Sequence, residues 1–293
     1  MLSFTEYRIS TMTATGYIGM NVNLDAFYEN VIIVDLEKEL KGIVYAEYGN
    51  NKHSQVFKGT NIKKKYVRVN GKKEAYMKRF DNSVTVKYRV NEKDTLNIKL
   101  FKNGKVQMTG VKSRDQGKDA INDLIEMIKH IYINHSTEIV ENIDNLELSK
   151  FNIHLINSDF KVDMEMRRDL LYNMLLKDFS VSCSYEPCIY PGVKIQYHLN
   201  KNADLKSTPY EKQGKCCCVS PCNGKGDGLT TDTCKKITIS IFQSGCVLIT
   251  GVTTEKHIDI AYDFITNVLR NNQEQIKRVK LQLPPLPPHI PIN

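Results

Sequence analysis

Polar and apolar residues alternate along several short segments of the chain, and two of these segments resemble each other. Residues 98–111 read IKLFKNGKVQMTGV, and residues 239–252 read ISIFQSGCVLITGV. Each contains two alternating runs around an Asn-Gly or Ser-Gly pair, which supplies the turn chemistry of a hairpin. Alternation with a period of two is typical of a half-buried strand. Both segments are therefore predicted to be β-hairpins.

A helical pattern follows each predicted hairpin, with apolar residues at spacings of three and four. In the first stretch these residues are Ala120, Leu124, Ile125, Ile128 and Ile131. In the second they are Ile258, Ala261, Phe264, Ile265, Val268 and Leu269. Upstream, a strand is expected at Tyr7–Thr13 and at Phe151–Val162. A shorter helix is expected around Leu24–Asn30 and Met166–Leu176.

The two hairpins share seven of fourteen positions at a constant offset of 141 residues, which indicates an internal duplication. The order strand, helix, strands, long helix occurs twice and predicts an α+β fold of two equal halves, residues 1–143 and 144–278. Three segments are additions to this frame. They are a basic insertion at 49–79, a Cys/Gly-rich insertion at 201–236 and a proline-rich tail at 279–293, which is expected to be extended.

Charge is concentrated in one place. The chain has a formal net charge of +8, and the segment between Gly49 and Phe80 holds ten Lys or Arg residues against the single acid Glu74. That segment alone carries +9, so the rest of the chain sums to about −1. Such a segment attracts phosphate backbones, although a solvated or disordered loop is the alternative.

The bulk composition, 41% hydrophobic and 25% charged, is that of an ordinary globular protein. No apolar run approaches the ~18–20 residues of a membrane span, and the N-terminus lacks a secretory pattern. We therefore expect the protein on the cytosolic or nuclear side, not secreted. The sequence contains no GxGxxG, GxxxxGK[ST], HExxH or GxSxG motif, so no enzymatic activity is expected.

Eight cysteines in a reducing compartment are expected to be free thiols or metal ligands rather than disulfides. Five of them fall in the second insertion, namely Cys216, Cys217, Cys218, Cys222 and Cys234. Their spacing matches no common zinc finger or ribbon, which favours a free or redox-sensitive loop. Zinc stays the alternative, and no metal or cofactor is assigned. His198 and His257 are expected to be surface or strand residues.

Several strings resemble the TATA-box-binding protein family over most of residues 5–278, apart from the insertions. Ser184–Gly192, SYEPCIYPG, is similar to the family's SYEPELFPG stirrup, and the two hairpins are similar to its IFxSGKxVxTG hairpins. Ala46-Glu47-Tyr48 and Lys78-Arg79-Phe80 match the two ends of the family's AEYNPKRF. The basic residues between them would then be an insertion in the first stirrup.

The resemblance implies a saddle of two pseudo-symmetric repeats, each with a curved antiparallel sheet and two helices on the convex face. The family is the best-known case of minor-groove binding that kinks DNA, by roughly 80°. By the same resemblance, Phe80, Phe101, Tyr190 and Phe242 are the aromatic wedges that enter between base steps, and Thr109 and Thr250 face the base edges. Double-stranded A·T-rich DNA is the implied ligand, bound by a monomer without a cofactor.

The chain departs from the family where asparagines read the base edges. An ungapped alignment puts Arg8 and Leu155 at those positions, and Asn157 takes the role if the second alignment slips by two residues. Lys99 and Ser240 replace leucines, and Gln107 replaces a valine. Arg8 and Lys99 are expected to favour a narrow, electronegative A·T-rich groove, with an altered preference for the standard TATA element.

The family also implies protein partners. Glu186 and Ile189 are the expected contacts of the second stirrup with the B-type general transcription factor, and the RNA polymerase machinery is the wider partner. A same-fold interaction scaffold that has lost specific DNA binding is the alternative function. The Lys-, Asn- and Ile-rich composition suggests an A+T-rich genome such as that of a large DNA virus, which places transcription in a nucleus or in a cytoplasmic viral compartment.

Overall fold

A computed structural model describes residues 2–35, 39–49, 56–59, 66–69, 72–75, 82–135, 138–201, 208–219, 222–230 and 233–279. The chain divides into two compact units. We call them the first unit, Arg8–Ser158 with Thr250–Glu255, and the second unit, Met1–Tyr7 with Asp159–Ile249 and Lys256–Asn293. The boundaries predicted for the two halves, at 1–143 and 144–278, stay a prediction.

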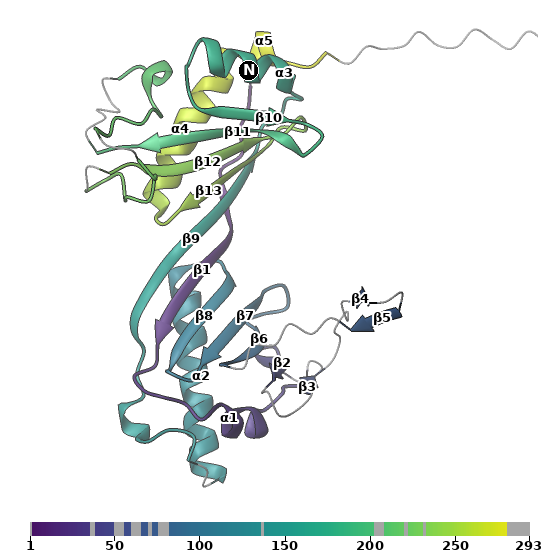
Figure 1. The fold of residues 1–293 in the computed structure, drawn as a ribbon, viewed down its shortest axis with the longest axis vertical. Coiled ribbons are helices and arrows are strands. Elements are labelled where there is room, and N and C mark those ends of the chain that lie inside the picture. Colours follow the sequence, from purple (N-terminus) through teal and green to yellow (C-terminus); the bar gives the residue numbers. More distant parts are fainter. Residues whose placement is uncertain are drawn as a thin grey trace, which may run out of the picture. The chain divides into compact units, whose positions relative to one another are not determined.

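The described part of the first unit contains a large antiparallel sheet and two α-helices (Figure 1). The sheet order is β9-β1-β8-β7-β6-β2-β3. Its elements are β1 (Arg8–Tyr17), α1 (Leu24–Asn30), β2 (Gly42–Tyr48), β3 (Val56–Gly59), β6 (Ser83–Arg89), β7 (Thr95–Phe101), β8 (Lys105–Val111), α2 (Arg114–His135), a short 3-10 turn (Ile143–Asn145) and most of β9 (Ser149–Lys161). A separate hairpin pairs β4 (Tyr66–Val69) with β5 (Lys72–Ala75).

The second unit also follows the order strand, helix, strands, helix, without counterparts of β3, β4 and β5 among its described strands. Its sheet runs β10-β11-β12-β13-β9. The elements are α3 (Arg168–Lys177), β10 (Cys183–Glu186), β11 (Tyr190–Leu199), a 3-10 turn (Tyr210–Lys212), β12 (Lys235–Ile241), β13 (Cys246–Val252), α4 (Glu255–Asn271) and α5 (Gln273–Ile276). The α+β fold class predicted from the sequence, with two repeats of a sheet and its helices, is confirmed.

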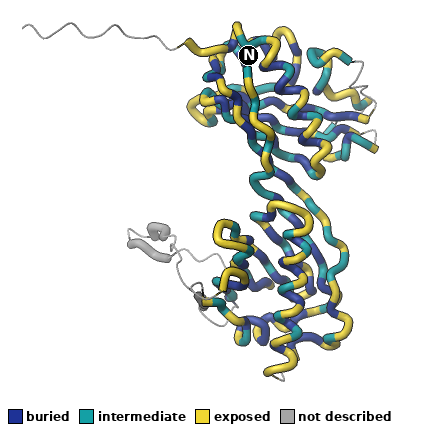
Figure 2. The backbone as a smooth tube through the Cα atoms, turned by 180° about the vertical axis from the view of Figure 1, so that it is seen from behind, coloured by how far each residue is buried: buried dark blue, intermediate teal, exposed yellow. Residues whose placement is uncertain are grey.

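Alternation along the strands separates one buried face of each sheet from the other face, because successive side chains of a strand point to opposite sides. In the first unit Val86, Ile98 and Met108 lie opposite one another on β6, β7 and β8, and each is at most 1% exposed. α2 covers this face with the apolar positions that the sequence predicted, all of which are buried. Figure 2 shows the buried positions following the strands and one side of the helices.

Tight turns join the strands of both predicted hairpins, and each turn depends on a glycine. Gly104 has φ +76°, and a Cβ there would lie 2.0 Å from the carbonyl oxygen of Met20. Gly245 has φ +82°, and its Cβ would lie 2.2 Å from the carbonyl oxygen of Val162. Only glycine combines a left-handed φ with this close approach of another backbone segment. Both hairpins are therefore confirmed.

Aromatic contacts show how α4 packs in the second unit. The ring centroids of Tyr197 on β11 and Phe264 on α4 are 4.8 Å apart, and Tyr262 packs edge-on against Phe160 of β9 at 4.7 Å. The apolar positions predicted for α4 are all buried as well. α4 therefore covers one face of the second sheet, as α2 covers one face of the first.

Three sequence expectations need comment. His257 is not a surface or strand residue, because it lies on α4 at 1% exposure with its ring against the 208–230 loop. Phe80, the greater part of the basic insertion and the proline-rich tail lie outside the described residues. None of the described helices is long and apolar enough to cross a membrane.

Candidate nucleic-acid interface

The sheet face of the first unit that α2 does not cover is polar. Directly paired residues of antiparallel strands lie on the same face. One row runs Thr15, Gln107, Lys99 and Thr85, and the next runs Thr13, Thr109, Asn97 and Lys87. We call these eight residues the polar face. It presents hydroxyls, amides and two ammonium groups, and none of the eight is acidic.

The polar face offers groups that bind nucleic acid through hydrogen bonds and charge. Hydroxyls and amides donate to the acceptors of base edges and sugars, and lysines neutralise phosphates. Thr15 Oγ1 lies 2.7 Å from His154 Nε2 on the neighbouring β9, which extends the polar surface by one strand. At the other end, Glu47 on β2 lies opposite Thr85 and accepts a 2.7 Å hydrogen bond from the Tyr45 hydroxyl.

Three of the residues predicted from the sequence share this face. Thr109 and Lys99 belong to the polar face, and Phe101 follows Lys99 by two residues at the end of β7, half-buried and opposite Ser83. Arg8 is exposed at the start of β1. It is separated from Met12 and Ala14, which are buried, by an even number of positions, so its side chain does not share the side of β1 that carries Thr13. The strand therefore does not bring Arg8 beside Thr109.

The structure describes one of the two further predicted residues, Phe80 and Thr250. Phe80 lies outside the described residues. Thr250 is half-buried on β13, at the point where that strand leaves the second unit. Sequence reasoning missed Thr13, Thr15, Thr85, Lys87 and Asn97, although the period of two along β1, β6 and β7 contained the signal.

Two aromatic residues predicted as wedges lie together in the second unit. The ring centroids of Tyr190 and Phe242 are 5.7 Å apart, with an interplanar angle of 59°. Lys194 Nζ lies 3.9 Å from the centroid of the Tyr190 ring. We call Tyr190 and Phe242 the aromatic pair. Aromatic rings at this separation attract each other, and the ammonium adds a cation–π contact.

A glycine makes room for the aromatic pair. The β11–β12 register pairs Lys194 with Ser240, and its extension by two residues puts Gly192 opposite Phe242. A Cβ on Gly192 would lie 2.9 Å from Tyr190 Cε1 and 3.2 Å from Phe242 Cε1. Any larger residue would therefore push the rings away. Gly192 is the last residue of the SYEPCIYPG motif, but the sequence alone did not connect it with the two rings.

The same sheet face continues with further polar rows. Gln196 lies opposite Thr238, and His198 lies opposite Lys236. Burial lowers the pKa of His198, a hydrogen bond to the Gln196 backbone raises it, and the nearby Lys236 ammonium lowers it. Protonation of this imidazole is therefore disfavoured relative to a free histidine.

The β10–β11 turn carries the two predicted partner contacts. Glu186 ends β10 and is exposed, and Ile189 is 81% exposed at the tip. The Ile189 N–H donates to the Glu186 carbonyl oxygen at 2.9 Å, which closes the turn. Arg168 of α3 contacts both strands next to the turn. Its guanidinium donates to the Pro191 carbonyl and lies 5.4 Å from the Tyr185 ring centroid.

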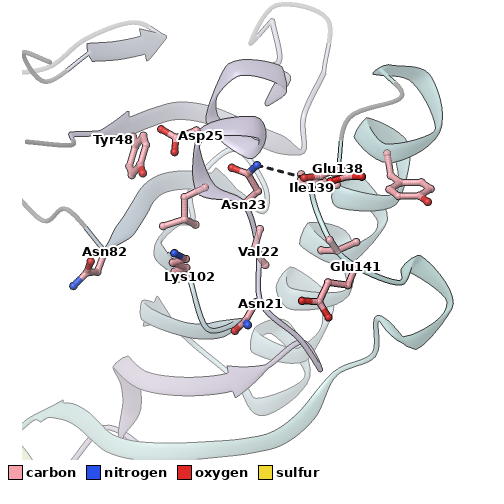
Figure 3. A pocket seen from close by; sticks show the side chains of 13 residues that line it. Asn21, Val22, Asn23, Asp25, Tyr48, Asn82, Lys102, Glu138, Ile139 and Glu141 are labelled. Atoms are coloured by element: carbon pink, nitrogen blue, oxygen red, sulfur yellow. Dashed lines mark hydrogen bonds between the residues drawn. The ribbon is translucent and has the colours of Figure 1, made fainter. Parts of the chain in front are cut away.

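A separate hollow in the first unit lies between the segment before α1 and the segment after α2 (Figure 3). The Asn23 side chain caps α1 by accepting from the Ala26 N–H, and its amide donates to the Glu138 carbonyl at 3.4 Å. Asp25, Glu138 and Glu141 line the hollow with Lys102. Among the described residues that line it, none is a cysteine, serine, threonine or histidine.

Comparison with known proteins gives three findings. The sequence model of the family described as "Transcription factor TFIID (or TATA-binding protein, TBP)" matches residues 66–131 and 152–272. The chain is 30% identical over 282 residues to a "TATA-box-binding protein-like" protein of Acanthamoeba polyphaga mimivirus, covering 94% of this chain and 68% of that protein. Its structure is similar to Methanococcus jannaschii TBP with a TM-score of 0.48 and 17% identity, covering 92% of this chain and 99% of that one. Since the family match covers more than half of the residues, the chain belongs to the TATA-box-binding protein family.

Proposed function

We propose that this protein is a transcription initiation factor that binds promoter DNA through the minor groove, bends it and recruits general transcription factors. Membership of the family supports a transcription-related, DNA-binding role. The observation that carries the finer proposal is the aromatic pair, Tyr190 and Phe242, held side by side over Gly192. Paired rings of this kind are suited to entering a base step and unstacking it.

The polar face supports contact with base edges and sugars in the same groove. The minor groove presents mainly acceptors at A·T pairs, and the threonine hydroxyls and the Asn97 and Gln107 amides can all donate to them. Lys87 and Lys99 add positive charge, which favours a narrow A·T-rich groove with its enhanced negative potential. The family is one of non-enzymatic transcription factors, and the proposed role requires neither catalysis nor a cofactor.

The test measures bending and binding together on a donor–acceptor duplex that carries a TATA element, beside a G·C-rich duplex of equal length. The wild-type protein is expected to raise FRET on the A·T-rich duplex at ~150 mM salt. The double variant Phe101→Ala/Phe242→Ala is expected to lose most of that rise while retaining weak electrostatic binding.

The control is Ile133→Ala. Ile133 is 71% exposed near the end of α2, so this change removes an apolar side chain away from the sheet face. Thermal unfolding of both variants checks that the fold is retained. Equal FRET in the double variant and the control would contradict the wedge assignment.

For the partner, we propose that Glu186 and Ile189 contact a B-type general transcription factor. A strongly exposed isoleucine at the tip of a closed turn, next to a carboxylate, offers an apolar contact with a charged neighbour. Ile189→Ser is expected to weaken partner recruitment to the DNA complex without changing DNA bending. Parallel reductions of bending and recruitment in this variant would count against a separate partner surface.

A same-fold protein scaffold without specific DNA binding is the second candidate. The observation that favours it is the polar pair Lys99 and Gln107, which face each other at positions where the family usually has apolar residues. Equal binding to A·T-rich and G·C-rich duplexes, abolished by salt and without bending, would favour the scaffold over the initiation factor.

A further inference from the structure

Four cysteines of the second insertion converge in space although their spacing in the sequence is irregular. The sulfur atoms of Cys216, Cys218, Cys222 and Cys234 all lie within 4.8 Å of one another. The Cys218–Cys234 Sγ distance is 3.4 Å, and the Cys216–Cys234 Sγ distance is 3.8 Å. A disulfide requires about 2.05 Å, so these thiols are gathered but not bonded.

We propose that Cys216, Cys218, Cys222 and Cys234 bind one zinc ion as a closed, tetrahedral structural site. A tetrahedron with Zn–S distances of about 2.3 Å has S···S edges of about 3.8 Å, and the distances of 3.4 and 3.8 Å lie close to this value. Four soft sulfur ligands select zinc over hard cations such as magnesium or calcium. The fifth cysteine of the segment, Cys217, is exposed and outside the cluster.

Neighbouring donors are placed to support thiolate ligands. The Gly224 N–H donates to Cys222 Sγ at 3.3 Å, and the Asn200 amide donates to Cys234 Sγ at 3.6 Å. Hydrogen bonds of this kind orient metal ligands and stabilise their negative charge. Cys234 is 0% exposed and directly precedes β12, so one ligand belongs to the rigid sheet.

Backbone hydrogen bonds around the four cysteines attach the loop to β12 and to the residue directly before it. The Gly226 N–H donates to the Cys234 carbonyl at 3.0 Å, and the Lys236 N–H donates to the Gly224 carbonyl at 2.9 Å. Gly224 has φ +68°, and a Cβ there would lie 2.5 Å from Lys236 Cβ. The approach of the loop to β12 is therefore built into the sequence at Gly224.

The described part of the insertion has no apolar core of its own. Within the described part of 201–236, the buried residues are Gly214, Gly224, Gly228 and Cys234, so no apolar side chain other than that cysteine is buried. Val219 is fully exposed. Small segments without a core need disulfides or a metal to fold, and metal-binding free energy becomes folding free energy for such segments. A zinc ion would supply that stabilisation and attach the loop to the β11–β12 end of the sheet.

The first experiment measures metal in the full-length protein purified without chelator. One zinc per chain is expected by elemental analysis. Replacement by Co²⁺ is expected to give the intense visible absorption of tetrahedral cobalt with four thiolates. Full-length protein that contains no zinc, takes up none from a zinc-supplemented buffer and gives no cobalt–thiolate absorption would overturn the proposal.

Cysteine alkylation tests the ligand set without any substitution. Cys216 and Cys217 are adjacent and both exposed, so they react alike with iodoacetamide if neither is a ligand. In the zinc-loaded protein we expect Cys217 and the exposed Cys188 to be alkylated while Cys216 is protected, and we expect chelation to expose Cys216. Equal alkylation of Cys216 and Cys217 in the zinc-loaded protein would count against Cys216 as a ligand.

Variants complete the test. Cys222→Ser is expected to lower the zinc affinity at least tenfold and to make the 208–230 loop sensitive to protease. Cys217→Ser, the matched control that lies between two ligands in the sequence, is expected to keep both zinc and protease resistance. Should Cys222→Ser fail to fold, the alkylation pattern of the wild-type chain still decides the assignment. Equal zinc content in the two variants would refute it.

Discussion

Tyr190 carries a phenolic hydroxyl at the edge of the aromatic pair, and this hydroxyl has a predictable effect on DNA binding. Under the proposed wedge role the ring enters a base step and its hydroxyl is desolvated, which costs roughly 1–3 kcal/mol if no partner replaces water. We expect Tyr190→Phe to keep the contacts with Phe242 and Lys194 and to lower the Kd for the bent complex about fivefold or more, as ~1 kcal/mol implies. Titration by FRET measures the change.

The matched control for this prediction is Tyr185→Phe. Tyr185 lies on β10, and its ring packs against the Arg168 guanidinium rather than against Phe242. The same hydroxyl deletion there is expected to leave the Kd within about twofold, a change of ~0.4 kcal/mol. A weaker Kd for Tyr190→Phe than for the wild type would mean that the hydroxyl makes a favourable contact with DNA.

His257 links stability to pH. Its Nε2 lies 2.8 Å from the Asp227 carbonyl oxygen, which only accepts, so the ring N–H donates. Burial lowers the pKa of His257 in the folded protein, while the unfolded value is about 6.5. The unfolded state therefore binds the proton more readily, and this contribution to stability is present above pH 6.5 and is lost as the pH falls below it.

The test compares the unfolding free energy of the wild type with that of His257→Gln between pH ~7.5 and ~5, a range that spans the unfolded pKa. The glutamine amide can still donate to the Asp227 carbonyl but does not titrate. The wild type is expected to lose stability more steeply below pH ~6.5, by at most about 1.4 kcal/mol for each pH unit. Because any metal effect is common to both proteins, parallel curves would show that His257 does not contribute to the pH dependence.

Hairpin turns show the dependence of whole elements on single residues. An alanine at position 245 would have to adopt φ +82°, and its Cβ would lie 2.2 Å from the Val162 carbonyl oxygen. Gly245→Ala is therefore expected to destabilise the second unit by about 2 kcal/mol or more, since left-handed backbone alone costs about 1–3 kcal/mol. Denaturant unfolding measures the loss. Ser244→Ala, at the exposed neighbouring position, is expected to stay within about 0.5 kcal/mol of the wild type.

Elements specified by local pattern could be predicted from the sequence. The Asn103-Gly104 and Ser244-Gly245 turns, the helix Leu24–Asn30 and the apolar stripes of α2 and α4 all follow from residue spacing, and the structure contains each of them. β1 continues to Tyr17, four residues beyond the predicted end, because Thr, Ala and Gly give little apolar alternation. The strands β3, β4 and β5 were not predicted, since the charge of that insertion dominates its pattern.

Site features that depend on tertiary contact could not be predicted in the same way. The burial of His257 arises from the loop that packs on α4, and the cysteine cluster forms because β12 brings Cys234 to three residues earlier in the chain. Neither arrangement leaves a local signal. Tyr190 and Phe242 were predicted as wedges through the family resemblance, but their common neighbour Gly192 became apparent only from the register of β11 and β12.

For the molecule as a whole, the distribution of charge predicts how binding depends on salt. Residues 50–77 contain eight Lys or Arg residues and one Glu, so their removal takes +7 from a chain whose net charge is +8. The remaining protein would be nearly neutral and would attract DNA mainly through the sheet faces. The slope of log K against log salt falls by about 0.9 for each DNA phosphate that the protein no longer neutralises.

We therefore expect deletion of residues 50–77 to weaken binding to every duplex and to flatten this slope, while the FRET change per bound A·T-rich duplex stays the same. The triple substitution Lys63→Gln, Lys64→Gln and Lys65→Gln is a milder control that keeps chain length and removes only charge. It should give an intermediate slope. The physical reason is that counterion release measures the number of phosphates neutralised, whereas the proposed bending would depend on the rings that enter the base steps. An unchanged slope after deletion would mean that the insertion does not contact DNA, and a loss of bending would mean that it positions the wedges as well.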